Sequence, residues 1–406
     1  MTHTRQMKWA LSLVCFAGLI QTSLGQTPAR FEQKEFVISF WVDPPADEQM
    51  DVHYRRIAEA NFTVVLGGFG ATTPEQMKRQ LELCEKYGLK VILPGRQGPA
   101  DQLPDGPACI GYILKDEPTA AEFPELAARV KEFRAARPGK LALINLFPSY
   151  APLSALGTPS YDEHVRLFVE QTNTDVLCFD YYPMMTPDAD GRQGYCENLE
   201  VVRRHSLQAG IPFWNFFNTM PFGPHSDPTE AQLCWQIYTS LAYGAKGVLY
   251  FCYWTPRGHE FPKGGAIITP EGRPTRHYEQ AKRINARLQQ LGPTLMKLTS
   301  TQVVRIKPKE DSRALLKGTP LRSLSDGDYL VGIFDHADGR QGVLLNNYHF
   351  AYTAWPTVKF AADPDKIVEI DPQTGEEVPL RDDSPDMPGL QLSLDAGEGR
   401  LFLVSE

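Results

Sequence analysis

The sequence predicts an α/β chain in which a closed parallel (β/α)8 barrel, a TIM barrel, precedes a C-terminal antiparallel β-sandwich. From residue 36 to about residue 298, short apolar runs alternate with segments of helical period, and beyond that point short strands and turns replace the helices. The apolar runs are continuous, which is typical of strands buried on both faces. The chain has 406 residues, 42% of them hydrophobic, which is enough for both units.

The first element has the pattern of a secretory signal peptide over residues 1–25. Arg5 and Lys8 precede an apolar run that ends at Ile20, and small residues at 23–25 allow cleavage before Gln26. About a dozen apolar residues cannot cross a hydrocarbon core of ~30 Å. We therefore expect no membrane span and a secreted or periplasmic protein.

The barrel is expected over residues 26–298. Strand-length apolar runs occupy Phe36–Val42, Phe62–Gly67, Lys90–Pro94, Cys109–Leu114, Leu141–Phe147, Val176–Tyr182, Ile211–Phe217 and Lys246–Trp254. Helix-period segments between or after them include Pro74–Tyr87, Glu122–Ala136, Tyr161–Gln171, Leu199–Ala209, Thr229–Tyr243 and Arg276–Leu291. Only a short Pro/Gly-rich connection, 95–108, follows the third strand, so we expect one outer helix to be missing or reduced there.

Eight strands in strict βα order favour a closed barrel. A doubly wound open sheet is the alternative, but no G-x-G-x-x-G turn or phosphate loop follows the first strand.

The sandwich is expected over residues 299–406, after a linker near Lys297–Lys309. Its predicted strands, separated by turn-forming Asp-Gly, Thr-Gly and Pro-Gly pairs, are Tyr329–Phe334, Gly342–Asn346, Thr357–Phe360, Ile367–Ile370, Leu390–Leu394 and Leu401–Val404. Two aromatic residues of this part, Tyr352 and Trp355, form either a sugar platform or, as we prefer, part of the domain interface.

Composition restricts the function. The formal charge of −8 and a pI near 5.7 argue against nucleic acid as a partner, because phosphate binding needs a basic face. No C-x-x-C pair or His/Cys spacing suggests a metal site, and no organic cofactor is expected. The sequence does not indicate an oligomeric state.

Reactive residues of a parallel barrel lie at the carboxyl ends of its strands. Carboxylates, amides and aromatic rings occur at five of these ends, a combination suited to carbohydrate, since rings stack on sugar faces and polar groups bind hydroxyls. The expected substrate-binding residues are Trp41, Asp43, Asp116, Tyr182, Asn215, Asn218, Trp254 and Glu260. Asp43, before two prolines, also fits a turn residue, and the aromatic residues also fit core positions.

Glu117 is the strongest candidate for a general acid. It ends the fourth strand, and Pro118 forces the chain to leave the strand there. Burial and Asp116 would raise its pKa, whereas Lys115 would lower the pKa if it pointed the same way.

These features resemble the clan A glycoside hydrolases, in particular bacterial β-galactosidase-like barrel proteins. The resemblance rests on the βα order, on Asp116-Glu117-Pro118, on Asp180-x-Tyr182-Pro183 and on the all-β tail with its Gly397-Glu398-Gly399 turn. It implies that Glu117 is the acid/base of a glycosidase. In that clan an asparagine precedes the glutamate, and here Asp116 takes its place.

The seventh strand departs from the clan pattern. The clan carries its nucleophilic glutamate there, and this strand offers only Asn215 and Asn218. Asp180 is the best substitute, as base or charge stabiliser. With strands ~4.8 Å apart, two carboxyl groups two strands apart would lie at roughly 6.5–9.5 Å, the separation of inverting enzymes.

We therefore expect a secreted glycoside hydrolase that cleaves an oligo- or polysaccharide. One alternative is a non-catalytic carbohydrate-binding barrel that has lost the strand-seven carboxylate. A polysaccharide lyase is the other, with Tyr182, Arg96 and Lys115 as its candidate groups.

Overall fold

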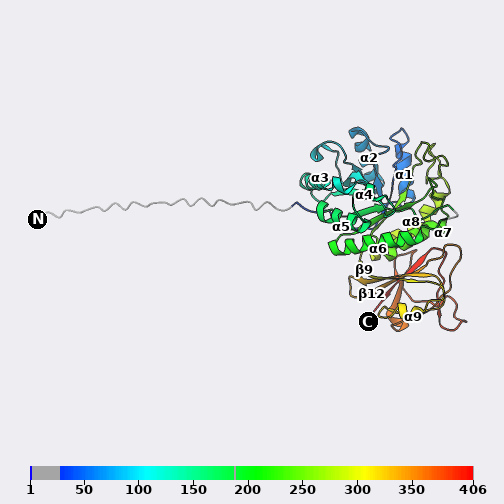
Figure 1. Ribbon diagram of the computed structural model, residues 1–406. Coiled ribbons are helices and arrows are strands. Elements are labelled where there is room, and N and C mark those ends of the chain that lie inside the picture. The colour runs from blue at the N-terminus through cyan, green and yellow to red at the C-terminus, as the bar shows by residue number, and fades with distance from the viewer. Residues whose placement is uncertain (2–27, 187–188, 406) are drawn as a thin grey trace.

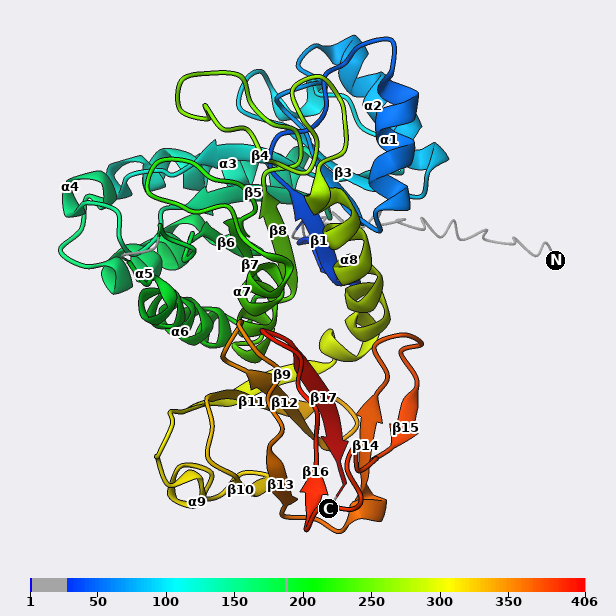
Figure 2. The same ribbon diagram turned by 90° about the vertical axis from the view of Figure 1, so that its right-hand side faces the viewer.

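The computed structural model describes Met1 and residues 28–186 and 189–405. Except for Met1, the predicted signal peptide, residues 1–25, lies outside these ranges. An upper α/β unit and a lower all-β unit make up the molecule, as Figures 1 and 2 both show.

Eight parallel strands form the upper sheet, in the order β1-β8-β7-β6-β5-β4-β3-β2. They are β1 (Val37–Phe40), β2 (Val64–Leu66), β3 (Lys90–Pro94), β4 (Cys109–Asp116), β5 (Leu141–Leu146), β6 (Leu177–Asp180), β7 (Phe213–Asn218) and β8 (Gly247–Phe251). The remaining gap is closed by Thr63, just before β2, whose N–H donates to the carbonyl of Ile38 on β1 at 2.9 Å. The predicted barrel is confirmed.

The outer helices are α1 (Met50–Glu59), α2 (Pro74–Lys86), α3 (Phe123–Ala136), α4 (Leu153–Leu156), α5 (Tyr161–Thr172), α6 (Arg192–Ala209), α7 (Glu230–Ala242) and α8 (Arg276–Leu295). Between β3 and β4 the chain makes only a single 3₁₀ turn, Ala100–Gln102, so the expected loss of one outer helix is confirmed. Thr73 caps α2 and Thr229 caps α7, each with a reciprocal bond to a glutamine side chain in the first turn.

Inside the barrel, alternate residues of the strands form one apolar core. Its members include Val37, Val64, Ile92, Ile113, Leu143, Cys178, Trp214 and Leu249. A second core lies between the strands and the outer helices, as in other (β/α)8 barrels.

The lower unit is a sandwich of two antiparallel sheets, ordered β15-β14-β17-β12-β11-β9 and β10-β13-β16. The strands of the larger sheet are β9 (Leu298–Ile306), β11 (Tyr329–His336), β12 (Gln341–Asn347), β14 (Ile367–Ile370), β15 (Glu377–Pro379) and β17 (Gly399–Val404). The smaller sheet consists of β10 (Leu321–Leu324), β13 (Thr357–Phe360) and β16 (Leu390–Gln391), and a short helix, α9 (Ser312–Leu315), precedes it. The predicted linker at 297–309 is wrong, because most of it forms β9, which pairs with β11 along its length.

Helix α7 lies between the two units. Ten consecutive residues, from Leu233 to Ala242, are buried, since one face packs on the barrel and the other on β11 and β12. The side-chain amide of Asn346 donates to the carbonyl of Tyr238 at 2.7 Å, and Arg287 of α8 forms an ion pair with Glu398 at 2.6 Å. The sandwich is thus fixed to the outer flank of the barrel.

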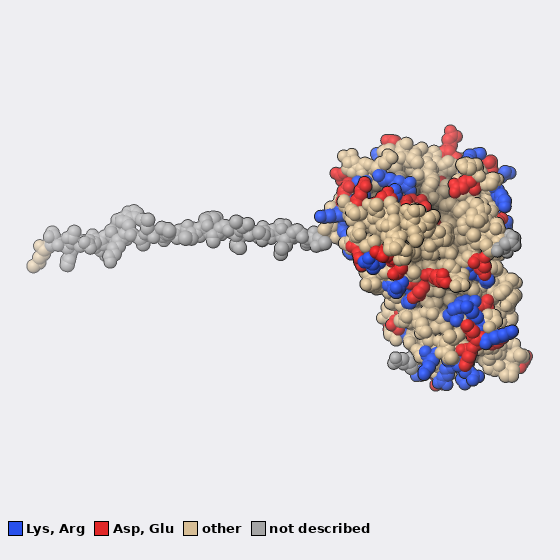
Figure 3. Space-filling view, in the orientation of Figure 1, with Lys and Arg blue, Asp and Glu red and all other residues tan. Residues whose placement is uncertain are grey.

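The six cysteines from Cys84 to Cys252 are all free thiols, and five of them are buried. Of the described helices, none is both long and apolar enough to cross a membrane. Acidic and basic side chains are interleaved over both units on the face that Figure 3 shows.

Candidate active site

Three neighbouring strands, β4, β5 and β6, bring acidic residues together at their carboxyl ends. In the β4–β5 ladder Asp116 lies opposite Asn145, and in the β5–β6 ladder Asn145 lies opposite Cys178. Asp180 ends β6 two residues later, where side-chain alternation returns it to the barrel interior. Asp116, Asn145 and Asp180 therefore face the same end of the barrel axis.

A bulge in β4 decides which residue of that strand faces inward. Ile113 pairs with Leu143, but Lys115 pairs with Ile144, so the register shifts by one residue between them. The shift turns Asp116 inward and Lys115 outward. Lys115 forms an ion pair with Glu122 at 2.7 Å on the outer side of the strand, so it does not share the inner face with Asp116.

Asn145 connects the acidic residues. Its side-chain amide donates to Oδ1 of Asp116 at 3.1 Å and to Oδ1 of Asp180 at 2.9 Å, and its backbone carbonyl accepts the N–H of Glu117 at 2.8 Å. The two side-chain bonds place those carboxylate oxygens within about 6 Å of each other. A single residue thus fixes the positions of all three acids.

Glu117 adopts a left-handed backbone conformation, with φ of 46°. This region is uncommon for a residue with a β-carbon, and such strain is concentrated at functional sites. The turn directs the chain out of β4 immediately after the last ladder hydrogen bond, and the buried ring of Pro118 follows. Glu117 lies half-buried at the mouth.

The electrostatics favour protonated carboxyl groups. Burial, and then the charge of Asp116, raise the pKa of Glu117 to about 7. Burial, then the charges of Glu117 and Asp116, raise the pKa of Asp180, while the hydrogen bond from Asn145 opposes the rise. Burial also raises the pKa of Asp116, against that same amide and the charge of Arg96. Burial first, and the charges of neighbouring acids second, thus favour the protonated forms of Glu117 and Asp180.

Aromatic residues surround this acidic cluster. The ring of Tyr182 lies 5.2 Å from Phe222, 5.6 Å from His225 and 5.1 Å from Phe251. Across the mouth, the Trp41 ring packs 5.2 Å from Phe69. These rings pack apolar surface around the carboxyl end of the barrel.

Two exposed aromatic residues lie at this mouth. Phe69, after β2, is 45% exposed, and Tyr150, after β5, is 49% exposed. Burial, and then the charge of Asp180, raise the pKa of the Tyr150 phenol.

The predicted site residues divide into two groups. Glu117, Asp180, Asp116, Tyr182 and Trp41 meet at the mouth, as described above.

The other five predicted residues do not join this group. The Asn215 amide points outward between α6 and α7, where it donates to Tyr195 at 2.6 Å and Ser240 at 3.0 Å. Asn218 accepts from the N–H of Met184 and donates to the carbonyl of Ser226, so its amide is used to hold loops.

Asp43 is a loop cap. Its buried carboxylate accepts the backbone N–H groups of Phe69, Gly70 and Ala71 and the amide of Gln80. The structure therefore supports its interpretation as a turn residue.

Trp254 and Glu260 lie after β8. The Trp254 ring packs 4.9 Å from His53 of α1. Glu260 lies in the exposed loop 256–265 and no hydrogen bond or ion pair links it to the acidic cluster.

Asn145 and Tyr150 were not predicted as site residues. Asn145 is the only polar side chain in the run Leu141–Phe147, and a lone amide in a doubly buried strand is the signal that would have identified it. Tyr150 lies in a loop, where the sequence carries no comparable signal.

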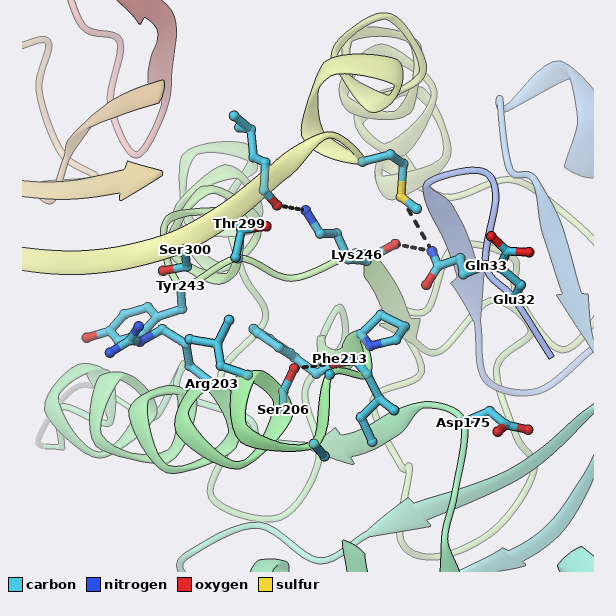
Figure 4. Close-up of a pocket in the computed structure, with 18 of the residues that line it drawn as sticks. Glu32, Gln33, Asp175, Arg203, Ser206, Phe213, Tyr243, Lys246, Thr299 and Ser300 are labelled. Atoms are coloured by element: carbon cyan, nitrogen blue, oxygen red, sulfur yellow. Dashed lines mark hydrogen bonds between the residues drawn. The ribbon is translucent and has the colours of Figure 1, made fainter. Parts of the chain in front are cut away.

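A cavity of about 760 Å³ lies at the opposite end of the barrel, where residues 30–33 and β9 meet the starts of β7 and β8 (Figure 4). Apart from the exposed Glu32, its charged groups are already engaged. Lys246 donates to the carbonyls of Leu295 and Leu298, and Asp175 binds Arg30 at 2.6 Å and Arg134 at 3.0 Å. This cavity therefore offers no acid pair for catalysis.

The chain is thus a (β/α)8 barrel with an acidic mouth and a C-terminal β-sandwich. Solved structures share this architecture. A GH42 β-galactosidase from G. stearothermophilus matches with a TM-score of 0.61 at 9% identity, over 91% of this chain and 98% of that one. A β-galactosidase from Bacillus circulans sp. alkalophilus matches with a TM-score of 0.59 at 11% identity, over 91% and 99%.

A family 39 glycoside hydrolase from the gut symbiont Bacteroides cellulosilyticus WH2 matches with a TM-score of 0.52 at 16% identity, over 91% of this chain and 80% of that one. At these identities the likeness shows a shared fold. No sequence-family model matches the chain, and comparison with curated proteins gives no match.

Proposed function

We propose that this protein is a secreted glycoside hydrolase that cleaves an oligo- or polysaccharide, with Glu117 as general acid and Asp180 as base or charge stabiliser. The observation that carries the proposal is the arrangement of Glu117, Asp116 and Asp180 around Asn145 at the mouth. The fold shared with glycoside hydrolases supports it. Export rests on the pattern of residues 1–25 alone.

The two acids are differently equipped for their roles. Asp180 accepts the amide of Asn145, which favours its ionised form, whereas no hydrogen bond from a described side chain stabilises the carboxylate of Glu117. The proposal places the proton shared by the pair on Glu117 in the reactive state, against the burial that also raises the pKa of Asp180. Glu117 would give this proton to the leaving glycosidic oxygen while a water molecule attacks the anomeric carbon and passes its proton to Asp180.

A water molecule as the nucleophile fits the seventh strand. No residue of Phe213–Asn218 is acidic, and Phe216 lies opposite Asp180 in the β6–β7 ladder. The same observation favours the second candidate function, a barrel that binds carbohydrate without cleaving it. A measurement of turnover distinguishes a hydrolase from a barrel that only binds carbohydrate.

Glu117→Gln should lower kcat for a polysaccharide or aryl glycoside by about 10²–10⁴-fold, because an amide cannot protonate the leaving oxygen. Glu125→Gln is the matched control, since Glu125 is an exposed glutamate beside the same part of the barrel. The measurement is product release from a broad panel of glycans and aryl glycosides. Full activity of Glu117→Gln would remove its assignment, and binding without turnover by the unmodified chain would favour the second candidate.

The pH profile gives an independent test. Because the acid must be protonated and its pKa is about 7, kcat/KM should fall about tenfold per pH unit above pH 7. The alkaline limb should be absent from any residual activity of Glu117→Gln.

A further inference from the structure

The connection between β12 and β13 exposes two large aromatic side chains on the sandwich. Tyr352 is 54% exposed and Trp355 is 53% exposed. Their neighbours Tyr348 and Phe350 instead pack against the Trp235 ring of α7, at 5.2 and 6.2 Å. The expectation that Tyr352 and Trp355 fill the domain interface is therefore wrong: the earlier two aromatic residues fill it and the later two face solvent.

Hydrogen bonds hold the backbone around the exposed pair. Asn347, which is buried, donates its amide to the carbonyls of Tyr352, Leu394 and Asp395 at 2.8, 3.3 and 3.3 Å. Beside Trp355, Ala354 pairs with Leu394 through two backbone hydrogen bonds of 2.9 Å. The loop is thus bonded on both sides to the chain segment before β17.

A stacked ring supports the Tyr352 side chain. The His349 imidazole lies 4.1 Å from it with an interplanar angle of 25°. One face of the phenol ring is therefore occupied, and little side-chain freedom remains to be lost when a ligand binds the other face.

The loop that carries the pair adjoins the starts of two outer helices of the barrel. Arg192, the first residue of α6, places its guanidinium 5.1 Å from the Phe350 ring, and Gly397 packs against Ala231, the second residue of α7. Outer helices of a parallel barrel begin at the end where the strands finish. A chain that leaves the mouth on the β6–β7 side would pass this loop.

The character of the surface suits carbohydrate. In the chain, Thr353 lies between the two aromatic residues, and its hydroxyl is 3.5 Å from the exposed carboxylate of Asp395. Rings of this size bury roughly 150–250 Å² each, so half-exposed they offer about 200 Å² together. A stable dimer needs about 800 Å² per partner, so a second copy does not fit this surface alone.

We propose that Tyr352 and Trp355 form a second, non-catalytic site that binds the polysaccharide substrate by stacking on its sugar rings. The substrate class rests on the proposed function of the mouth. The site would hold a long chain near the mouth and leave the cleavage of small glycosides unaffected.

The test uses the full chain with Glu117→Gln, so that bound polysaccharide is not cleaved. Its migration is measured in native gels that contain birch xylan, potato galactan, citrus pectin or barley β-glucan. The Tyr352→Ala/Trp355→Ala variant should lose affinity by about tenfold or more for the polysaccharide that retards the parent. The matched control is Leu315→Ala/Met387→Ala, which removes two exposed apolar side chains from the same domain.

Equal retardation of the aromatic variant and its parent, or no retardation of the parent in any of the four gels, would overturn the proposal. A doubled mass in sedimentation that the aromatic substitutions abolish would identify a second copy as the occupant and also overturn it. In the chain with Glu117 intact, aryl glycoside turnover should be unchanged by the aromatic substitutions. If retardation depends on Tyr352 and Trp355 but the chain with Glu117 intact hydrolyses no glycan, the proposed function is wrong and the binding site is supported.

Discussion

Asn145 shows how much of the candidate active site depends on one amide. It contacts Asp116 and Asp180 through its side chain and Glu117 through its carbonyl, so its position sets the geometry of all three. A hydrogen bond to a charged group contributes about 1.5–3 kcal/mol, which is large beside the tuning that a general acid and base need. Asn145 acts through the acids and is a positioning residue.

Asn145→Ala should lower kcat by about 10–100-fold, because Asp180 loses the donor that favours its ionised form. The acidic limb of the pH profile should move to higher pH, since the pKa of Asp180 rises further. Asn285→Ala is the control: it removes a buried amide that binds Tyr250 and Ala60 away from the mouth. If the acidic limb lies at the same pH in Asn145→Ala and in the parent, Asn145 does not tune Asp180 and contributes only to packing.

Among the elements, β4 and α7 show what the sequence can and cannot predict. The apolar run Cys109–Leu114 and the following proline placed Glu117 correctly at a strand end. Whether Lys115 or Asp116 faces inward depends on the β4 bulge, and a bulge leaves no mark in the hydrophobic pattern. For α7, the long apolar stretch was consistent with a helix, but its burial on both sides comes from a domain contact that periodicity does not contain.

The contact between α7 and the sandwich depends on close backbone approach at Gly397. A β-carbon there would lie 2.2 Å from the carbonyl oxygen of Ala231, and the residue has φ of 73°. Gly397→Ala should lower the free energy of unfolding by about 2–4 kcal/mol, through overpacking added to backbone strain.

The control for this substitution is Gly339→Ala, with φ of 96° and no atom within 4 Å of the added carbon. This variant should lose only about 1 kcal/mol, since backbone strain acts alone. Urea unfolding measures both variants. Equal losses would mean that α7 and the sandwich can move apart at little cost.

For the molecule as a whole, the acidic mouth opposes stability at neutral pH. Glu117 has its pKa raised from 4.5 to about 7, so between these values the folded state holds a proton that the unfolded state releases. The free energy of unfolding must therefore decrease as the pH rises through this window. The pKa values of Asp116 and Asp180 are raised in the same direction.

Glu117→Gln should consequently be more stable than the parent by roughly 1–2 kcal/mol at pH 8, after allowance for partial exposure, and equal to it at pH 4. Chemical denaturation at the two pH values measures the difference, with Glu125→Gln as the unchanged control. A variant that is less stable at pH 8 would show that the glutamate is not the desolvated group described here.

At this scale the sequence predicted the architecture well. Eight apolar runs mark the doubly buried strands, and near residue 298 helix-period segments give way to short strands and turns, so both patterns extend over whole domains. It predicted the site less completely. Trp41, Asp116, Tyr182 and the two acids reached the mouth, whereas Asn215 and Asn218 are used by helices and loops, since their direction depends on strand phase and on the polar partners present there.

The free thiols have a practical consequence for obtaining this protein. Five of the six lie in the packed interior, where burial raises their pKa values and keeps them unreactive, and no covalent cross-link between them supports the fold. We therefore expect the described part of the chain to fold with these six cysteines reduced. Cytosolic expression in an ordinary bacterial host, with reductant present throughout purification, is compatible with everything that stabilises it.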